Sequence, residues 1–179
     1  MYPIFRFMLE MRRARKLPPL AMGETHVTRV TCLPWDIDYQ FEMNNGRVLT
    51  LFDIGRVVML ERLGVVERVR KLNWYGTIAG STIRYRRRIT LFQKLEMRSR
   101  VIGIDERFNY IEQSFWRLGD GECCAHAVLR VAITTGKGII PTAEVVEKLG
   151  LEYPEMTLPV WVKAWDASER QRPWPPEKV

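Results

Sequence analysis

Three carboxylates gather in a short stretch of the sequence, just before a run of apolar residues with helical spacing. Asp36, Asp38 and Glu42 lie among residues that favour turns and helix caps. The N-terminus of a helix offers unpaired backbone N–H groups and the positive end of the helix dipole. It can hold a carbonyl oxygen as negative charge develops there, while a carboxylate beside it attacks the carbonyl or activates a water. The alternative is that the aspartates only shape the turn and that Asn44 or Asn45 only caps the helix.

A second candidate for chemistry is the group formed by Cys123, Cys124 and His126. In an extended strand Cys124 and His126 share one face, whereas Cys123 points to the other. A Cys/His nucleophile pair would lack a visible orienting group. Buried structural cysteines beside a core histidine are the favoured interpretation.

Basic residues are concentrated in two places of a chain whose formal net charge is +7. Residues 1–20 hold five basic residues and one acidic residue, and residues 84–100 hold seven and one. Two local patches indicate an anionic partner, such as nucleotide phosphates, a lipid surface or nucleic acid. On a strand Arg84, Arg86 and Arg88 would share one face. Solvated arginines on exposed strands are the alternative.

The elements that must position these residues are one helix and several strands. Apolar residues recur at helical spacing over residues 47–63 and leave few polar positions, which predicts a helix buried on most sides and ended by Gly64. Strands are predicted over residues 25–33, 74–92, 94–104, 107–118 and 122–134. A buried helix followed by long strands predicts an α+β fold in which a curved antiparallel sheet wraps the helix.

The two ends of the chain differ from this central part. Residues 1–20 read as amphipathic turns that lie on the domain or on a membrane and end at Pro18-Pro19. The tail, residues 141–179, reads as a short helix over 142–149 followed by a Pro/Trp-rich segment packed outside. We expect one domain over residues 21–140 with these two segments against it.

Composition excludes several classes of protein. Apolar residues make up 46% of the 179 residues, enough to fill a core. Three cysteines are too few for a disulfide scaffold and favour a reducing, cytoplasmic location. Two histidines without metal-ligand spacing predict no metal and no cofactor. No apolar run approaches the roughly 20 residues needed to cross a bilayer.

A family signature is recognisable in residues 35–56, which read WDIDYQFEMNNGRVLTLFDIGR. They resemble the loop–helix signature of hot-dog-fold acyl-CoA thioesterases, the 4-hydroxybenzoyl-CoA thioesterase-like group. Its usual form is Asp-x-Asp-x-x-x-His-x-Asn-Asn-x-x-Tyr. Within the group the stretch is most similar to the thioesterase superfamily "member six" type, and the likeness continues through residues 84–121. The resemblance implies a hot-dog fold, a role in lipid metabolism, and dimers or tetramers with acyl-CoA pockets between subunits.

The resemblance also implies roles for single residues. Asp38 matches the catalytic carboxylate, and Asn44 and Asn45 match the Asn-Asn pair where a backbone amide would face the thioester oxygen. Asp53 matches an acidic residue that relatives often carry inside the helix. Glu42, however, stands where the family has histidine. A carboxylate at this position puts a second negative charge near Asp38; because like charges disfavour joint ionisation, we expect either a proton-sharing pair or a spoiled nucleophile.

Three hypotheses follow. The first is acyl-CoA thioester hydrolysis with Asp38 as nucleophile or general base. The second is a non-catalytic acyl-CoA or lipid-binding protein of the same fold, because of Glu42. The third is a basic surface module; nucleic acid is disfavoured as its partner because no aromatic–basic stacking pattern is present, and peripheral membrane contact through the basic N-terminus stays open. The residues assigned to the site are, for catalysis, Asp38, Glu42 and Asp53, and, for acyl-CoA binding, Asn44, Asn45, Gly46, Arg84, Arg86 and Arg88.

Overall fold

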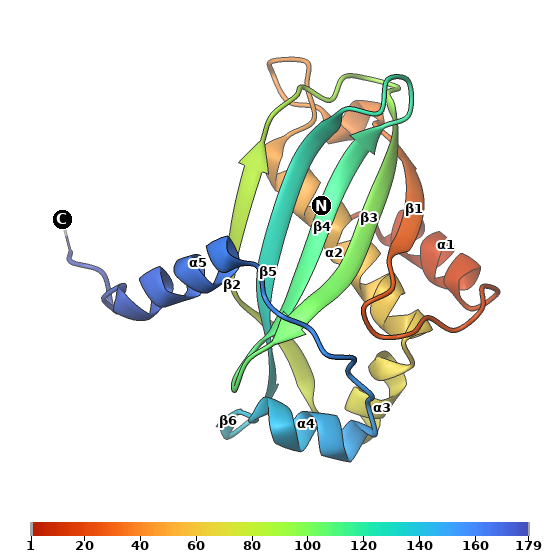
Figure 1. Cartoon of the computed structure of the whole chain (residues 1–179). Coiled ribbons are helices and arrows are strands. Elements are labelled where there is room, and N and C mark those ends of the chain that lie inside the picture. The colour runs from red at the N-terminus through yellow and green to blue at the C-terminus, as the bar shows by residue number, and fades with distance from the viewer. Residues whose placement is uncertain (1, 179) are drawn as a thin grey trace.

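The computed structural model describes residues 2–178. Within them, an antiparallel sheet of six strands curls around one long helix, α2 (Asn45–Arg62), as Figure 1 shows. The strand order is β1-β3-β4-β5-β2, and β6 pairs with β5. The expected α+β fold, with a curved antiparallel sheet wrapped around a helix, is confirmed.

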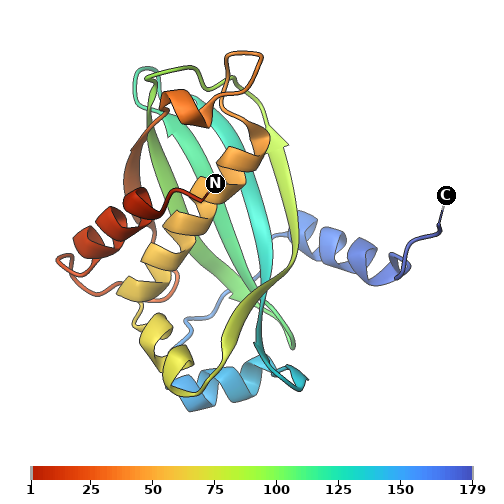
Figure 2. The ribbon, with the colours of Figure 1, turned by 180° about the vertical axis from the view of Figure 1, so that it is seen from behind.

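The sheet and α2 form the central unit, and the other helices flank it (Figure 2). The strands are β1 (His26–Thr31), β2 (Tyr75–Tyr85), β3 (Lys94–Ile104), β4 (Asn109–Arg117), β5 (Cys123–Thr135) and β6 (Gly138–Ile139). The other helices are α1 (Ile4–Ala14), α3 (Val65–Lys71), α4 (Thr142–Leu149) and α5 (Val160–Gln171), with a 3-10 turn over Pro34–Asp36.

The core lies between α2 and the concave face of the sheet. Phe52 is fully buried, and its ring stacks on that of Phe115 with centroids 4.7 Å apart. Gly55 allows α2 to approach β3 closely, because a Cβ there would lie 2.5 Å from Cε of Met97. Helix α2 is apolar on most sides because the sheet buries it on one side and α1 buries it on another.

Several elements differ from the sequence prediction. The strand predicted over 74–92 ends at Tyr85, so Arg86 and Arg88 lie in the following loop and do not continue the strand face that carries Arg84. Gly64 adopts a left-handed conformation with φ of 68°, and the chain turns there into the unpredicted α3. Strand β6 and helix α5 were also not predicted.

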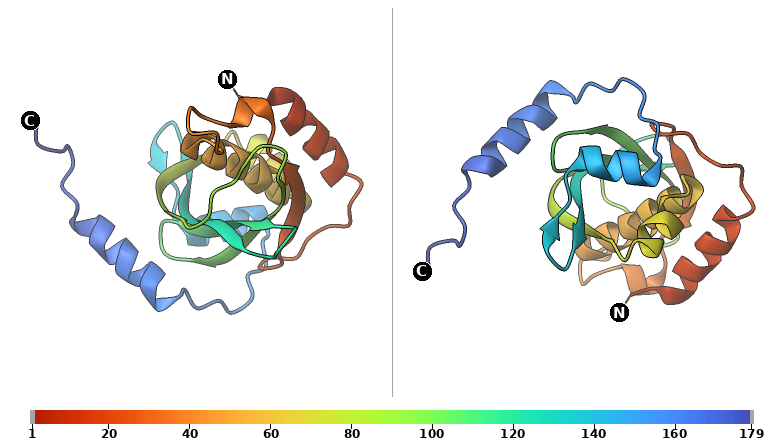
Figure 3. Two further views of the ribbon diagram at one scale, coloured as in Figure 1. Left: turned by 90° about the horizontal axis from the view of Figure 1, so that it is seen from above. Right: turned by 90° about the horizontal axis from the view of Figure 1, so that it is seen from below.

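The two ends of the chain contact the outside of this unit. Helix α1 packs on α2 alongside β1. Helix α5 runs obliquely away from the sheet, and the segment that follows it, up to residue 178, lies away from the core in both views of Figure 3. None of the helices in residues 2–178 combines the length and the hydropathy of a bilayer-spanning segment.

Candidate functional site

The loop before α2 places Asp38 beside the start of that helix. The Asp38 N–H donates to the Glu42 carbonyl at 2.8 Å, and the Asp38 carboxylate accepts the Gln40 N–H at 2.8 Å. The half-buried side chain lines an open depression of about 500 Å³, together with Asn44 and Gly46 from the helix start and Tyr2 from the N-terminal segment. The structure thus brings together these three of the predicted residues.

Within residues 2–178, the backbone amides in the first turn of α2 differ in their hydrogen-bond partners. The Asn44 side chain caps the helix by accepting the N–H groups of Gly46 at 2.9 Å and Arg47 at 3.3 Å. The Asn45 N–H donates to no protein acceptor in residues 2–178. This amide lies at the positive end of the helix dipole and remains available to an oxygen of a bound molecule.

Asp36, the other aspartate of the pair, has a structural role. It is 1% exposed and forms ion pairs with Arg6 of α1 at 3.1 Å and with Arg47 of α2 at 3.3 Å. Its carboxylate also accepts the Leu33 N–H at 3.0 Å, and its carbonyl accepts the Asn44 N–H at 2.9 Å. Asp36 therefore ties α1, the loop and α2 together, which fixes the position of Asp38. Sequence reasoning missed both arginines.

Glu42 points to a different partner. Its carboxylate accepts a hydrogen bond from Nε of Arg88 at 2.6 Å, and its backbone bridges Thr90 in the loop after β2. Glu42, which was predicted to act in catalysis, is thus ion-paired with Arg88, which was predicted to bind acyl-CoA. Arg84 and Arg86 are exposed and form no ion pair within the described part of the chain.

Asp53 lies about two turns further along α2 and is not brought together with Asp38. One carboxylate oxygen accepts the Tyr2 hydroxyl at 2.8 Å, and the other pairs with Arg56. Burial and this hydrogen bond raise the pKa of Tyr2. Both oxygens of Asp53 are therefore engaged by neighbouring side chains.

Arg56 is held from behind by a buried amide. Its guanidinium donates to Gln113 Oε1 at 3.1 Å, and Gln113 Nε2 donates to the Phe52 carbonyl at 2.7 Å and to Ser99 Oγ at 2.8 Å. Burial lowers the pKa of Arg56, whereas the charge of Asp53 opposes that change. These hydrogen bonds fix Arg56 against the sheet. The periodicity of the sequence did not indicate the buried Gln113 on the sheet.

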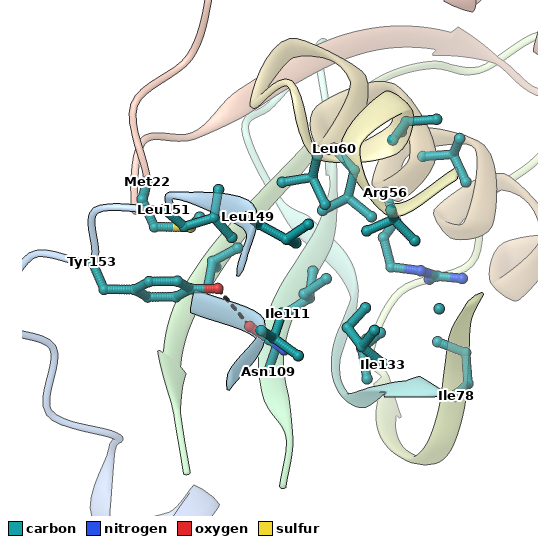
Figure 4. A pocket seen from close by; sticks show the side chains of 18 of the residues that line it. Met22, Arg56, Leu60, Ile78, Asn109, Ile111, Ile133, Leu149, Leu151 and Tyr153 are labelled. Carbon is teal, nitrogen blue, oxygen red and sulfur yellow. Dashed lines mark hydrogen bonds between the residues drawn. The ribbon is translucent and has the colours of Figure 1, made fainter. Parts of the chain in front are cut away.

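Asp53 and Arg56 also line an apolar cavity of about 280 Å³ between the sheet and helices α2, α3 and α4. Leu60, Ile111 and Ile133 project into it in Figure 4. At another part of the wall the Tyr153 hydroxyl donates to Asn109 Oδ1 at 2.6 Å, and burial raises the pKa of Tyr153 to about 12. The cavity is suited to an apolar group, such as an acyl chain.

The cysteines and histidines do not form a second reactive centre. His126 pairs with Glu112 at 2.9 Å, and burial raises the pKa of Cys124, which disfavours its thiolate. In residues 2–178 no three His, Cys, Asp or Glu side chains come together as metal ligands would.

Comparison with known proteins gives a consistent result. Residues 32–175 match the model of a family described as the thioesterase-like superfamily. Protein THEM6 of Xenopus laevis is 33% identical over 141 residues, which cover 78% of this chain and 68% of that protein. Protein THEM6 of Danio rerio is 34% identical over 101 residues, 56% of this chain, and the match spans half of its length.

The fold is also found among solved structures. The probable thioesterase YbaW of Escherichia coli superposes with a TM-score of 0.64 at 21% identity, over 69% of this chain and 95% of that one. The hot-dog architecture expected from the resemblance is thereby confirmed. Because the family model matches most of the residues of this chain, the chain belongs to the thioesterase-like superfamily.

Proposed function

We propose that the chain hydrolyses acyl-CoA thioesters at the N-terminus of α2. Membership of the thioesterase-like superfamily supports thioester hydrolysis as the general activity. The observation that carries the finer proposal is that the Asp38 carboxylate shares a depression with the start of α2, where the Asn45 amide is free to bind an oxygen.

In this reaction the thioester carbonyl oxygen accepts the Asn45 N–H, and negative charge on it is stabilised by the helix dipole. Asp38 takes a proton from a water that adds to the carbonyl carbon, or adds directly and is released by water in a second step. The carbon–sulfur bond then breaks. When water is the nucleophile, the proton that Asp38 took from it passes to the sulfur; when Asp38 adds directly, the sulfur leaves as a thiolate and gains its proton from the water that hydrolyses the acyl–Asp38 anhydride. The products are a carboxylic acid and the free thiol of CoA.

The apolar cavity along the same helix is the proposed place for the acyl chain. Asp53, at its wall, is the second candidate carboxylate; its engagement by Tyr2 and Arg56 favours a role in positioning. Arg84 and Arg86 are proposed to meet CoA phosphates, because guanidinium groups bind phosphate in a forked geometry. Arg88 would have to exchange Glu42 for phosphate.

We further propose that the protein acts as a homo-oligomer in lipid metabolism, in the cytoplasm. The second candidate function keeps the fold without turnover: an acyl-CoA or lipid-binding protein. The observation that favours it is the ion pair between Glu42 and Arg88, which stands where the family signature has histidine.

The test is hydrolysis of an acyl-CoA panel of increasing chain length by the wild type and Asp38→Asn. We expect the variant to lose about 10²-fold or more in kcat, the range for a general base. Asp53→Asn reports on the second carboxylate, and Asp120→Asn, in the exposed β4–β5 turn, is the matched control and should hydrolyse normally.

Equal rates for wild type and Asp38→Asn would remove Asp38 from the mechanism. Tight acyl-CoA binding without turnover by the wild type, together with hydrolysis gained on Glu42→His, would favour the binding protein instead.

A further inference from the structure

Helix α1 has two unlike faces. The inner face carries Phe7, Met11 and Ala14, which pack against the core next to α2. The outer face of its first two turns carries apolar side chains in solvent. Their exposed fractions are 58% for Ile4, 91% for Phe5, 61% for Met8 and 48% for Leu9. A contiguous apolar surface of this kind marks an interaction site.

The outer face becomes basic towards the end of the helix. Arg12 and Arg13 are exposed on it, and Lys16 is exposed in the turn that directly follows the helix. Arg13 pairs with Glu10 at 2.6 Å, but neither Arg12 nor Lys16 is ion-paired in residues 2–178. An apolar stripe next to unneutralised cations matches a partner that is apolar inside and anionic at its surface.

The outer face of α1 lies far from the sheet edge formed by β2. Helix α1 lies alongside β1, whereas β2 forms the opposite edge (Figures 1 and 2). A second copy that pairs with β2 would therefore leave the outer face of α1 uncovered.

We propose that α1 is a membrane-binding helix that lies in the surface of an anionic bilayer. Phe5, Met8 and Leu9 enter the boundary between headgroups and acyl chains, and Arg12 and Lys16 meet the lipid phosphates. Tyr2, next to the same helix, contacts Asp53. Docking would thus hold the candidate site at the membrane, where acyl compounds of low solubility accumulate. The binding itself does not depend on the proposed hydrolysis.

The test is co-sedimentation of the full chain with vesicles of phosphatidylcholine alone or mixed with phosphatidylglycerol. We expect binding to the mixed vesicles that weakens as salt is added, because surface charges are screened. Phe5→Ser/Met8→Ser should abolish binding at every salt concentration. Arg12→Gln/Lys16→Gln should weaken it by on the order of tenfold and flatten its salt dependence.

The matched controls are Val160→Ser on α5 and Arg70→Gln/Lys71→Gln on α3, all at exposed positions, which should bind as the wild type does. The proposal fails if the wild type does not sediment with the mixed vesicles, or if all variants bind equally. It also fails if Phe5→Ser/Met8→Ser reduces the oligomeric state in size-exclusion chromatography, because α1 would then contact a second copy. Each readout is independent of thioester hydrolysis.

Discussion

His26 is the first residue of β1 and contacts Arg62 at the end of α2, and the protein keeps its ring neutral there. The ring is 2% exposed, and its Nδ1 accepts the Arg62 guanidinium at 2.8 Å, which leaves Nε2 to contact Thr28 Oγ1 at 2.8 Å. Arg62 also donates to the Pro18 carbonyl. Burial, and then the charge of Arg62, lower the pKa of His26 to about 4. His26 thus helps to anchor the N-terminal segment.

This residue predicts a loss of stability in mild acid. An unfolded histidine has a pKa near 6.5, so between about pH 6.5 and 4 the unfolded chain binds a proton that the folded chain refuses. The free energy of unfolding therefore falls as the pH is lowered through this window, by about 2 kcal/mol at pH 5. Urea unfolding between pH 7.5 and 5 measures it. His26→Gln, which can still accept from Arg62, should lack this slope; an unchanged slope would assign the effect to other groups.

At the scale of elements, α5 is attached by a buried cation. Arg130 on β5 is 7% exposed, and its guanidinium donates to Asp166 on α5 at 2.9 Å. The same guanidinium lies 5.0 Å from the ring centroid of Phe108 and 5.2 Å from that of Trp165. A flat cation between two rings is stabilised by its charge and by its packing.

Arg130→Met should release α5 from the sheet. Asp166 keeps Arg170 as a partner, so its charge is not left alone. We therefore expect the attachment of α5 to lose about 2–3 kcal/mol of stability, less than the usual cost of leaving a buried charge unpaired. Limited proteolysis should then cut before or within α5 while the sheet stays intact. Arg172→Met, at the exposed end of the helix, is the matched control. Equal resistance of both variants to protease would contradict the proposed attachment.

The same helix explains what the sequence could and could not predict. The central helix was predicted within two residues at each end because its apolar pattern is local. Helix α5 buries little beyond Val162 and Asp166 and depends on Arg130, which is distant in sequence. Strand β2 ends at Tyr85 because the next two amides both turn to the Cys124 carbonyl.

In the candidate site, too, contacts between sequence neighbours could be predicted and contacts between distant residues could not. Asp38 and the helix start are neighbours in sequence, so their proximity in the fold could be predicted from the loop and the cap. The contacts of Tyr2 with Asp53 and of Arg6 with Asp36 join residues 51 and 30 positions apart. No periodicity or short motif encodes such contacts; they follow from where α1 packs on α2.

At the scale of the whole molecule, the edge strand β2 has little protection: one charged residue, Arg84 near its end, and one register irregularity between Ile78 and Gly80. It pairs with β5 on one side only, and most of its residues are exposed. Natural edge strands are usually guarded by charges, proline or a covering element, yet residues 75–83 contain no charged residue and no proline. Such an edge is suited to antiparallel pairing with the same strand of a second copy, which would make one continuous sheet across a two-fold axis.

Charges placed on this edge should therefore separate the copies. Ala79→Lys/Ser81→Lys adds positive charges to the middle of β2 in both copies, and like charges on two paired strands are destabilising. We expect analytical ultracentrifugation to show a dimer for the wild type and a monomer for this variant. Val27→Lys, on the opposite edge strand β1, adds a charge at a comparably exposed position and should remain dimeric. A dimer that survives the β2 substitutions would have to be held by another surface, and a wild-type monomer would contradict the pairing directly.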